Sequence, residues 1–335
     1  PIAIAPEGVY LQKIREAGIE CVTYGIERKS LNPLKEIKAI QNIYEAIKPL
    51  NLDILHTFTA KPNIYGTIAG RLAKVPRIIN LVEGLGSFYL ENDLKSRVVR
   101  TLIERLYKQI FRLSNAVMFV NSDDPEYMSR KNIIDPKKIV KINGVGIDTK
   151  EWSRKKAAKE PLTVVMIARL IRHKGVIEYL QASQNLKERY GDVRFVYVGG
   201  EDFGNHSGLG KEIFENYKGV EYLGEQSDIK GILQDSHIFV LPSYREGLPR
   251  TALEAMSMEV AVVGADACGT RDVVRDGKTG LLVPVKESQA LEAAIEKLIT
   301  DEKLRNKLTK TAREVCVKEY DIKPIVKAHL RVYGI

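Results

Sequence analysis

Short apolar runs alternate with segments of helix length along most of this 335-residue chain. Polar and turn residues flank each run, as they flank the buried strands of a parallel sheet. The runs fall into two sets, at residues 2–5, 20–24, 52–57, 77–82, 116–120 and 138–143 and at residues 163–168, 193–198, 220–223, 237–241, 260–264 and 280–283. Strands that alternate with helices build parallel sheets covered on both faces, and ligands bind such sheets beyond the carboxyl ends of the strands.

A polar stretch at residues 152–161 separates the two sets of strands. A chain of this length is large enough for two domains, each with its own core. We therefore predict an α/β protein with one Rossmann-like domain over residues 1–152 and a second Rossmann-like domain that begins at residue 153. Two such domains that face each other would enclose a cleft.

The most informative chemistry lies at residues 242–255, directly after the apolar run 237–241. Glu246 falls on a loop broken by glycine and proline, and Glu254 falls on the following helix, whose first turn tolerates proline. Helix N-termini bind phosphate esters through backbone N–H groups. Two carboxylates beside such a phosphate site can accept hydrogen bonds from the hydroxyls of a sugar nucleotide. The turn predicted to bind the phosphate consists of Gly247, Leu248, Pro249, Arg250 and Thr251. The alternative is that both glutamates are ordinary surface residues.

A second polar cluster follows the apolar run 163–168. Arg169 and Lys174 stand at the mouth of this strand-to-helix turn, ahead of a helical pattern over 176–186. A guanidinium fork and a compact ammonium can together hold the two phosphates of a diphosphate. The alternative is a solvated basic loop.

Together the two clusters resemble the retaining, nucleotide-sugar-dependent glycosyltransferases of family 4, which have the GT-B fold of two Rossmann-like domains facing across a cleft. The series that carries the resemblance is Ala168-Arg169, Lys174-Gly175, Val198-Gly199-Gly200, Leu223-Gly224, residues 242–249, Glu254-Ala255-Met256 and residues 276–284. It covers roughly residues 160 to 285 in the family's order. Each member is a weak signal, but the ordered series is specific.

The resemblance implies a role for each polar residue. Glu254 would hold the nucleotide ribose, and Glu246 would hold the hydroxyls of the donor sugar. Uridine is expected near residues 198–201 and 223–229, which include Gly200, Glu201 and Gly224. The UDP-sugar is a co-substrate, no cofactor is implied, and no Asp-rich metal motif is evident in the sequence.

The start of the chain departs from the resembled family. The first apolar run is followed by Pro6-Glu7-Gly8 and a helical segment, as in the second strand-helix unit of these enzymes. We therefore expect the first domain to lack the family's opening strand and its glycine-rich loop. The resemblance also implies that the second domain ends at residue 318 and that residues 319–335 carry a helix back to the first domain.

The acceptor would bind to the first domain. The apolar run 77–82 leads into Glu83, a residue that is histidine in many family relatives, and into a turn with Gly84 and Gly86. A carboxylate and a neutral imidazole differ in charge and in proton affinity, so the substitution bears on how the acceptor hydroxyl is polarised. His56 is expected near the cleft, with a structural role as the alternative.

Two segments narrow the resemblance further. Residues 81–89 and the stretch Ser30-Leu31-Asn32-Pro33 resemble the subgroup that transfers N-acetylgalactosamine to a polyprenyl-diphosphate-linked sugar in bacterial N-glycan assembly. We therefore expect a retaining, metal-independent hexosyltransferase with a UDP-sugar donor and a polyprenyl-diphosphate-linked saccharide acceptor.

Charge is concentrated in the first 150 residues, where 23 Lys and Arg against 16 Asp and Glu give a net charge of +7. Residues 94–113 form a helical pattern with Arg97, Arg100, Arg105, Lys108 and Arg112. The apolar positions of this pattern are Leu94, Val98, Val99, Leu102, Ile103, Leu106, Ile110 and Leu113. We expect most of these apolar side chains in the domain core, which would leave the basic face free to contact anionic lipid.

The sequence contains no apolar stretch near the roughly 20 residues that a membrane span requires, and no signal-peptide pattern. The cysteines, Cys21, Cys268 and Cys316, are odd in number and far apart, which argues against a disulfide framework. We therefore expect a cytoplasmic enzyme, peripheral on the inner face of the bacterial cytoplasmic membrane.

Other functions remain open at this point. A different donor sugar, a soluble or polysaccharide-precursor acceptor, and a GT-B sugar-nucleotide epimerase would all share the predicted fold. A nucleic-acid-binding protein would explain the basic charge but not the glutamates at the strand ends, so we expect no nucleic-acid partner.

Overall fold

The computed structural model describes residues 1–26, 32–91 and 93–335. Ser30 and Leu31, which contribute to the resemblance, lie outside the described residues. By its internal contacts the chain divides into one compact unit of residues 1–119 and 124–141 and a second of residues 120–123 and 142–335. The predicted return of residues 319–335 to the first domain stays a prediction.

The second unit is built on one six-stranded parallel sheet. Its strands are β7 (Thr163–Ile167), β8 (Arg194–Val198), β9 (Val220–Tyr222), β10 (Ile238–Leu241), β11 (Ala261–Ala265) and β12 (Leu281–Val283). Their order in the sheet is β12-β11-β10-β7-β8-β9, so the direction of winding reverses between β7 and β10. A doubly wound sheet binds its ligand outside the carboxyl ends of the strands at such a reversal.

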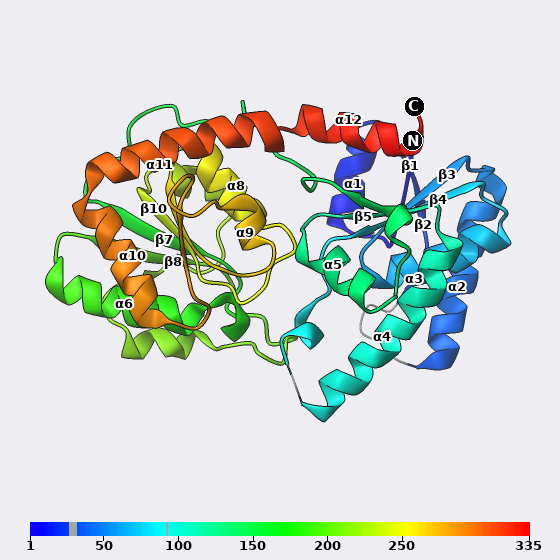
Figure 1. Cartoon of the computed structure of the whole chain (residues 1–335), viewed down its shortest axis with the longest axis horizontal. Helices are drawn as coiled ribbons and strands as arrows, with labels where there is room; N and C mark the ends of the chain where they lie inside the picture. Colours follow the sequence, from blue (N-terminus) through cyan, green and yellow to red (C-terminus); the bar gives the residue numbers. More distant parts are fainter. Residues whose placement is uncertain (27–31, 92) are drawn as a thin grey trace. The chain divides into compact units, whose positions relative to one another are not determined.

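Helices cover both faces of this sheet (Figure 1). Val164 and Met166 face one core with α6 (Val176–Arg189) and α10 (Ser288–Thr300). Val165 and Ile167 face the other core with α8 (Arg250–Ser257) and α11 (Glu302–Val315). The strands are therefore buried on both sides, which explains why they read as continuous apolar runs. The remaining helices of this unit are α7 (Ile229–Gln234), α9 (Thr270–Val273) and α12 (Ile322–Tyr333).

The first unit contains two parallel sheets. A two-stranded sheet pairs β1 (Ile2–Ala5) with β2 (Glu20–Thr23), and a four-stranded sheet places β3 (Ile54–Phe58), β4 (Arg77–Val82), β5 (Ala116–Phe119) and β6 (Ile139–Lys141) in chain order. The helices are α1 (Val9–Glu16), α2 (Pro33–Ile47), α3 (Ala60–Leu72), α4 (Leu94–Leu113) and α5 (Asp123–Arg130). Every predicted strand is confirmed in position, with ends shifted by up to two residues.

A buried polar network joins α3 to the four-stranded sheet. Asn80 on β4 donates to Thr57 Oγ1 on β3 at 2.7 Å and to Thr67 Oγ1 on α3 at 2.8 Å. Thr57 donates to Asn63 Oδ1 at 2.7 Å, and Asn63 donates to the carbonyl of Leu81 at 2.8 Å. Buried polar groups that are mutually paired fix one packing arrangement, because any slip would leave them without partners. The network therefore fixes α3 against the sheet.

The expectation that α4 buries most of its apolar residues is wrong. Ile110 is buried, but Leu94, Val98, Leu102, Leu106 and Leu113 are exposed, with exposed fractions of 78%, 61%, 58%, 40% and 42%. The buried side chains of α4 are Ser96, Tyr107, Ile110 and Phe111. The error arose because α4 carries apolar residues around most of its circumference, so that helical spacing alone did not identify the face that packs on the core.

The exposed face of α4 also carries positive charge. Lys95, Arg97, Arg105 and Arg112 are exposed on the same helix. At its carboxyl end, Lys138 donates to the carbonyls of Phe111, Arg112 and Ser114 at 2.8 to 2.9 Å. Cations at this end of a helix satisfy its terminal carbonyls and offset its dipole. The stripe formed by Leu94, Val98, Leu102, Leu106 and Leu113, the α4 stripe below, is therefore presented on a firmly attached helix.

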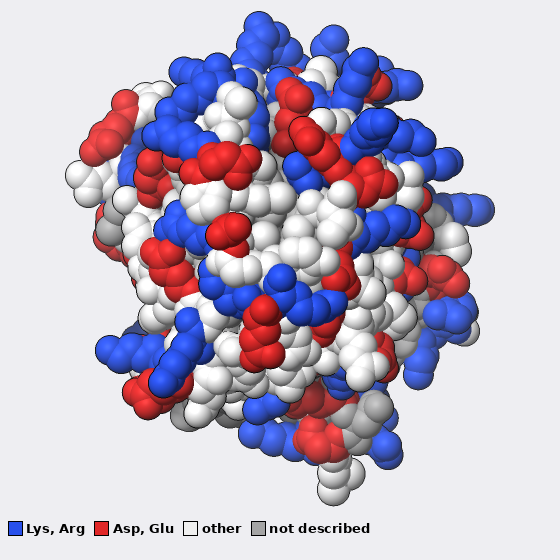
Figure 2. Space-filling model, turned by 90° about the vertical axis from the view of Figure 1, so that its left-hand side faces the viewer, with Lys and Arg blue, Asp and Glu red and all other residues white. Residues whose placement is uncertain are grey.

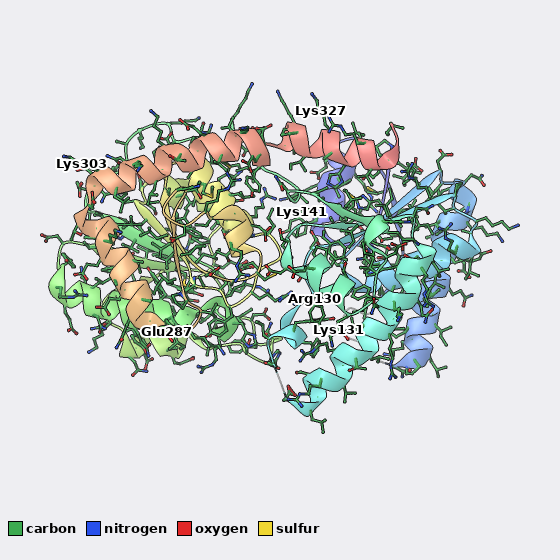
Figure 3. All side chains as sticks on the ribbon, in the orientation of Figure 1. Arg130, Lys131, Lys141, Glu287, Lys303 and Lys327 are labelled. Carbon is green, nitrogen blue, oxygen red and sulfur yellow. The ribbon has the colours of Figure 1, made fainter. Side chains whose placement is uncertain are left out.

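Charge is mixed on the face that Figure 2 shows. Lys and Arg are interspersed with Asp and Glu over most of it and are most crowded along its upper edge. Lys303 on α11 and Lys327 on α12 are exposed and point outward from the helices that form the upper edge in Figure 3. No continuous basic track of the kind that follows a nucleic-acid backbone crosses this face.

Candidate active site

The reversal in the second unit's sheet brings two loops together. Residues 168–175 follow β7 and residues 242–249 follow β10, and these strands are hydrogen-bonded neighbours. Tyr244 N donates to the carbonyl of His173 at 2.9 Å, so the loops are also joined directly. Gly175 has φ of +77°, and a β-carbon there would lie 2.3 Å from the carbonyl oxygen of Pro242. Only glycine permits this close approach of the two loops.

Lys174 and Glu246 meet across these loops. Lys174 Nζ lies 2.6 Å from Glu246 Oε1. Both side chains are largely shielded from solvent, with exposed fractions of 23% and 13%. Shielding strengthens the attraction between the ammonium and the carboxylate and holds both in defined positions. The pair presents one cation and one hydrogen-bond acceptor at the point where a ligand of this sheet is expected.

Arg169 lies on the same loop as Lys174 but contacts a different carboxylate. Its Nη1 lies 2.5 Å from Asp202 Oδ2, in the loop after β8. The guanidinium is mostly exposed. An exposed pair of this type contributes only about 0 to 1 kcal/mol, so an incoming phosphate can displace Asp202 at little cost.

The predicted phosphate turn leads into α8. Gly247, Leu248 and Pro249 precede the helix, and Pro249 occupies its N-cap position. Among the hydrogen bonds of the described residues, those to the carbonyl of Pro249 come from Ala252 and Leu253. The N–H groups of Arg250 and Thr251 therefore stand in the first turn, where the helix itself provides no acceptor. They are available to an anion there.

Glu254 lies one turn into α8 and is buried. Its Oε1 accepts a hydrogen bond of 2.9 Å from Arg250 Nε. Removal from water raises the pKa of Glu254, and the charge and hydrogen bond of Arg250 oppose that rise. A carboxylate fixed in this way retains acceptor positions for ligand hydroxyls.

The expected nucleobase residues follow β8 and β9 at the same edge of the sheet. Gly199 N donates to the carbonyl of Gly224 at 2.8 Å, and Leu170 N donates to the carbonyl of Gly200 at 2.9 Å. Glu201 Oε1 accepts a hydrogen bond of 2.8 Å from Lys211 N. These bonds join the loops after β7, β8 and β9, so Gly200, Glu201 and Gly224 lie along one edge with Arg169.

The predicted acceptor residues lie in the first unit. His56 lies inside β3, which begins at Ile54 and ends at Phe58. Its ring lies 4.3 Å from that of Phe58. Glu83 is the first residue after β4, and its turn contains Gly84 and Gly86, whose φ values of +151° and +83° favour glycine. Glu83 is exposed at this edge, yet the surrounding protein partly desolvates its carboxyl group and raises its pKa.

Sequence reasoning missed two polar partners in the second unit. Asp202 pairs with Arg169, and Glu178 accepts a hydrogen bond from Tyr244. Glu178 carried a usable signal, since it is an acidic residue in the first turn of the helix that follows Lys174. The sequence signal for Asp202 was weaker: it is an acidic residue shortly after the glycine pair that follows a strand.

Family models match most of the chain. The model described as "Glycosyl transferases group 1" matches residues 148–315, and the model described as "Glycosyl transferase 4-like" matches residues 2–121. The two matches cover all the strands except β6, which lies between them.

Two curated bacterial proteins illustrate the sequence similarity. The chain is 37% identical, over 98% of its length and 89% of the other protein, to the N,N'-diacetylbacillosaminyl-diphospho-undecaprenol alpha-1,3-N-acetylgalactosaminyltransferase of Campylobacter jejuni. It is 27% identical, over 88% of its length and 78% of the other protein, to the UDP-Gal:alpha-D-GlcNAc-diphosphoundecaprenol alpha-1,3-galactosyltransferase of Escherichia coli.

Solved structures share the fold at lower identity. A glycosyltransferase from Rickettsia africae superposes with a TM-score of 0.80 at 20% identity, covering 99% of this chain and 89% of that one. Anabaena HepE in complex with UDP and glucose superposes with a TM-score of 0.78 at 18% identity, covering 99% of this chain and 91% of that one. With the parallel sheets described above, these similarities show a two-domain GT-B fold.

Proposed function

The chain belongs to the group 1 glycosyl transferases, and from this premise we propose that it transfers N-acetylgalactosamine from a UDP-sugar to a polyprenyl-diphosphate-linked saccharide. The observation that carries the proposal is the 37% identity, over nearly the whole chain, to a protein named for transfer to an undecaprenyl-diphosphate-linked sugar. The relative at 27% identity is named for galactose transfer to an acceptor of the same type. The shared acceptor class supports the lipid-linked acceptor, and the higher identity favours N-acetylgalactosamine over galactose.

The second unit would bind the UDP-sugar. In the proposed complex, Arg169, Lys174 and the first turn of α8 bind the diphosphate, and Glu254 binds the ribose. Glu246 binds hydroxyls of the sugar, and the uracil lies near Gly200, Glu201 and Gly224. Anabaena HepE has the same fold, and its structure is a complex with UDP and glucose. That complex supports a UDP-sugar as the donor.

The charges that develop during the reaction explain why cations and carboxylates lie together in the donor site. When the bond from the anomeric carbon to the diphosphate breaks, negative charge grows on the leaving phosphate and positive character grows on the sugar ring. Glu246 and Asp202 hold Lys174 and Arg169 at the ligand edge of the sheet before the donor arrives, so both cations are in place to stabilise the leaving group. We propose that these cations perform the charge neutralisation without a divalent metal, and that no cofactor takes part.

Retention of configuration follows from a same-face path. The acceptor hydroxyl approaches the face of the sugar from which the diphosphate departs, and the leaving phosphate oxygen takes the hydroxyl proton as the new bond forms. In the first unit, Glu83 would polarise or orient that hydroxyl, and His56 lies on the neighbouring strand, opposite Ile79. The raised pKa of Glu83 makes its carboxylate a better proton acceptor than an ordinary glutamate.

The α4 stripe supports contact with a membrane. Exposed leucine and valine side chains lie on the same face of α4 as exposed Lys95, Arg97, Arg105 and Arg112. Apolar residues between cations are the features of a helix that lies in the interface of an anionic bilayer. A polyprenyl-linked acceptor resides in such a bilayer, so we propose that the enzyme attaches peripherally to the inner face of the cytoplasmic membrane through α4. No helix among the described residues is long and apolar enough to cross a bilayer.

Product analysis tests the proposed reaction. The chain is incubated with each of several UDP-sugars and with polyprenyl-diphosphate-linked saccharides, and the products are identified by mass. We expect one N-acetylhexosamine to be added to the lipid-linked saccharide only when both substrates are present. Conversion of the UDP-sugar alone would instead show an epimerase, and transfer to a soluble saccharide alone would refute the lipid-linked acceptor.

A further inference from the structure

A second side-chain contact joins the two loops of the donor site, behind the Lys174–Glu246 pair. The hydroxyl of Tyr244 donates to Glu178 Oε1 at 2.6 Å. Glu178 lies in the first turn of α6 and is buried. Burial raises the pKa of the Tyr244 phenol, and its hydrogen bond to the Glu178 carboxylate raises the pKa further, so the phenol stays a neutral donor. A buried hydrogen bond to a carboxylate is stronger than one between neutral groups.

The two contacts tie together the same two stretches of chain. Lys174 ends the 3-10 turn Arg172–Lys174, and Glu178 lies in the first turn of α6. Tyr244 and Glu246 are two residues apart in the opposite loop. Each stretch therefore contributes one residue to each contact. We call Lys174–Glu246 the outer rung and Glu178–Tyr244 the inner rung.

The two rungs differ in what the donor would do to them. Both members of the outer rung are assigned to the substrate, Lys174 to the diphosphate and Glu246 to sugar hydroxyls, so donor binding redirects both groups. Neither Glu178 nor Tyr244 is assigned to the substrate, and Glu178 is buried with its Oε2 enclosed by protein. The hydrogen bond of the inner rung therefore persists when donor binding breaks the ion pair of the outer rung.

We propose that Tyr244, held by Glu178, is a positioning residue that keeps the Lys174 and Glu246 loops at their working distance while the donor occupies the outer rung. This inference rests on the proposed function of the same site. The Tyr244 ring is also held from one face, where Lys286 Nζ lies 5.0 Å from the ring centroid. A cation over an aromatic face restricts the ring and supports the direction in which the hydroxyl points.

Tyr244→Phe tests the inner rung because it removes one oxygen and keeps the ring. We expect kcat for sugar transfer to fall by about 10- to 100-fold, since small misplacements of catalytic groups cost that much. The affinity for UDP is expected to fall much less than kcat, because UDP keeps the diphosphate that Lys174 binds but lacks the sugar that Glu246 binds. A kcat within twofold of the parent would overturn the proposal. So would a UDP affinity that falls as much as kcat, because that result indicates a general loss of structure.

Tyr179→Phe is the matched control. Tyr179 is the next residue after Glu178, and its buried hydroxyl donates to the carbonyl of Val196 at 2.8 Å, in the core rather than to the loop. Its loss is expected to lower the unfolding temperature without lowering kcat of the folded enzyme. An equal fall in kcat for Tyr179→Phe and Tyr244→Phe would show that any lost buried hydroxyl in this region has the same effect, and would overturn the proposal.

Two variants of Glu178 give an independent measurement. Glu178→Gln keeps an oxygen that accepts from Tyr244, and Glu178→Leu does not. We expect the glutamine variant to recover most of the turnover that the leucine variant loses, and equal turnover in the two would contradict a role for the hydrogen bond. If Glu178→Leu does not fold, the turnover of Tyr244→Phe alone decides whether the inner rung positions the loops.

Glu246→Gln separates failure of the inference from failure of the proposed function. Unchanged sugar transfer in Glu246→Gln refutes the proposed function of the site. Impaired transfer in Glu246→Gln together with normal transfer in Tyr244→Phe refutes only the inner rung.

Discussion

Replacing two members of the α4 stripe with serine tests membrane attachment directly. Val98 and Leu102 are exposed, lie one helical turn apart and are flanked by Arg97 and Arg105. Neither belongs to the buried set of α4, so the change to serine leaves the core of the first unit intact. The double variant Val98→Ser/Leu102→Ser should therefore fold normally and bind membranes poorly.

The expected loss can be worked out from the exposed fractions. Complete burial of a valine or leucine side chain contributes about 1.5 to 3 kcal/mol. The parts of Val98 and Leu102 that are still exposed, 61% and 58%, leave about 1 to 1.8 kcal/mol for each to gain on entering the bilayer interface. The double variant should lose about 2 to 3.5 kcal/mol, which corresponds to a roughly 30- to 300-fold weaker partition.

Co-sedimentation with vesicles that contain an anionic phospholipid measures this partition. Val145→Ser is a matched control, because Val145 is 47% exposed in a loop of the second unit and lies outside the α4 stripe. The control should bind vesicles like the parent, and parent binding should weaken as salt rises. Parent-like binding by the double variant, or an equal loss in the control, would refute attachment through α4.

Three further predictions concern the site. Lys174→Ala should lower kcat by about 100- to 1,000-fold, as loss of a preorganised donor to a developing charge does, and near-normal single-turnover rates would remove Lys174 from the leaving-group role. Glu83 has a raised pKa, so turnover should fall with acid already above the pH at which an ordinary glutamate protonates, and this acid limb should be absent from the pH–rate profile of Glu83→Gln. Glu254 also has a raised folded-state pKa, so its ionisation opposes folding and the unfolding free energy should fall as pH rises from the ordinary glutamate value through the raised one. Glu254→Gln should remove this pH dependence and raise the unfolding free energy at neutral pH, as measured by denaturant titration. The same variant should bind UDP about tenfold more weakly in calorimetry. An unchanged affinity for UDP would contradict the contact between Glu254 and the ribose.

Strand positions could be predicted because they depend on a local pattern. In β7 and β10 every residue is buried, so apolar identity alone marks the strand. The ends were less accurate: β3 begins at Ile54 and ends at Phe58 instead of spanning residues 52–57, since the pairing of β3 with β4 decides where the strand ends. The face of α4 was predicted wrongly because apolar residues occupy both its buried and its exposed sides.

Residues of the site could be predicted where they follow strands. Glu246 and Lys174 stand after β10 and β7, and the sheet order brings the two loops side by side. The partners Asp202 and Glu178 could not be paired with Arg169 and Tyr244 from the sequence, because those contacts depend on the register of loops that are 33 and 66 residues apart.

The paired side chains beneath α3 have a consequence for altering acceptor choice. Thr57, Asn63 and Asn80 satisfy one another inside the unit, away from the positions where a saccharide would be recognised. Changes at His56 or Glu83 therefore leave the framework's internal bonds untouched. His56 and Glu83 can therefore be varied, in relatives or by engineering, without rebuilding the network that supports them, whereas a single change to Asn80 should disable every such variant.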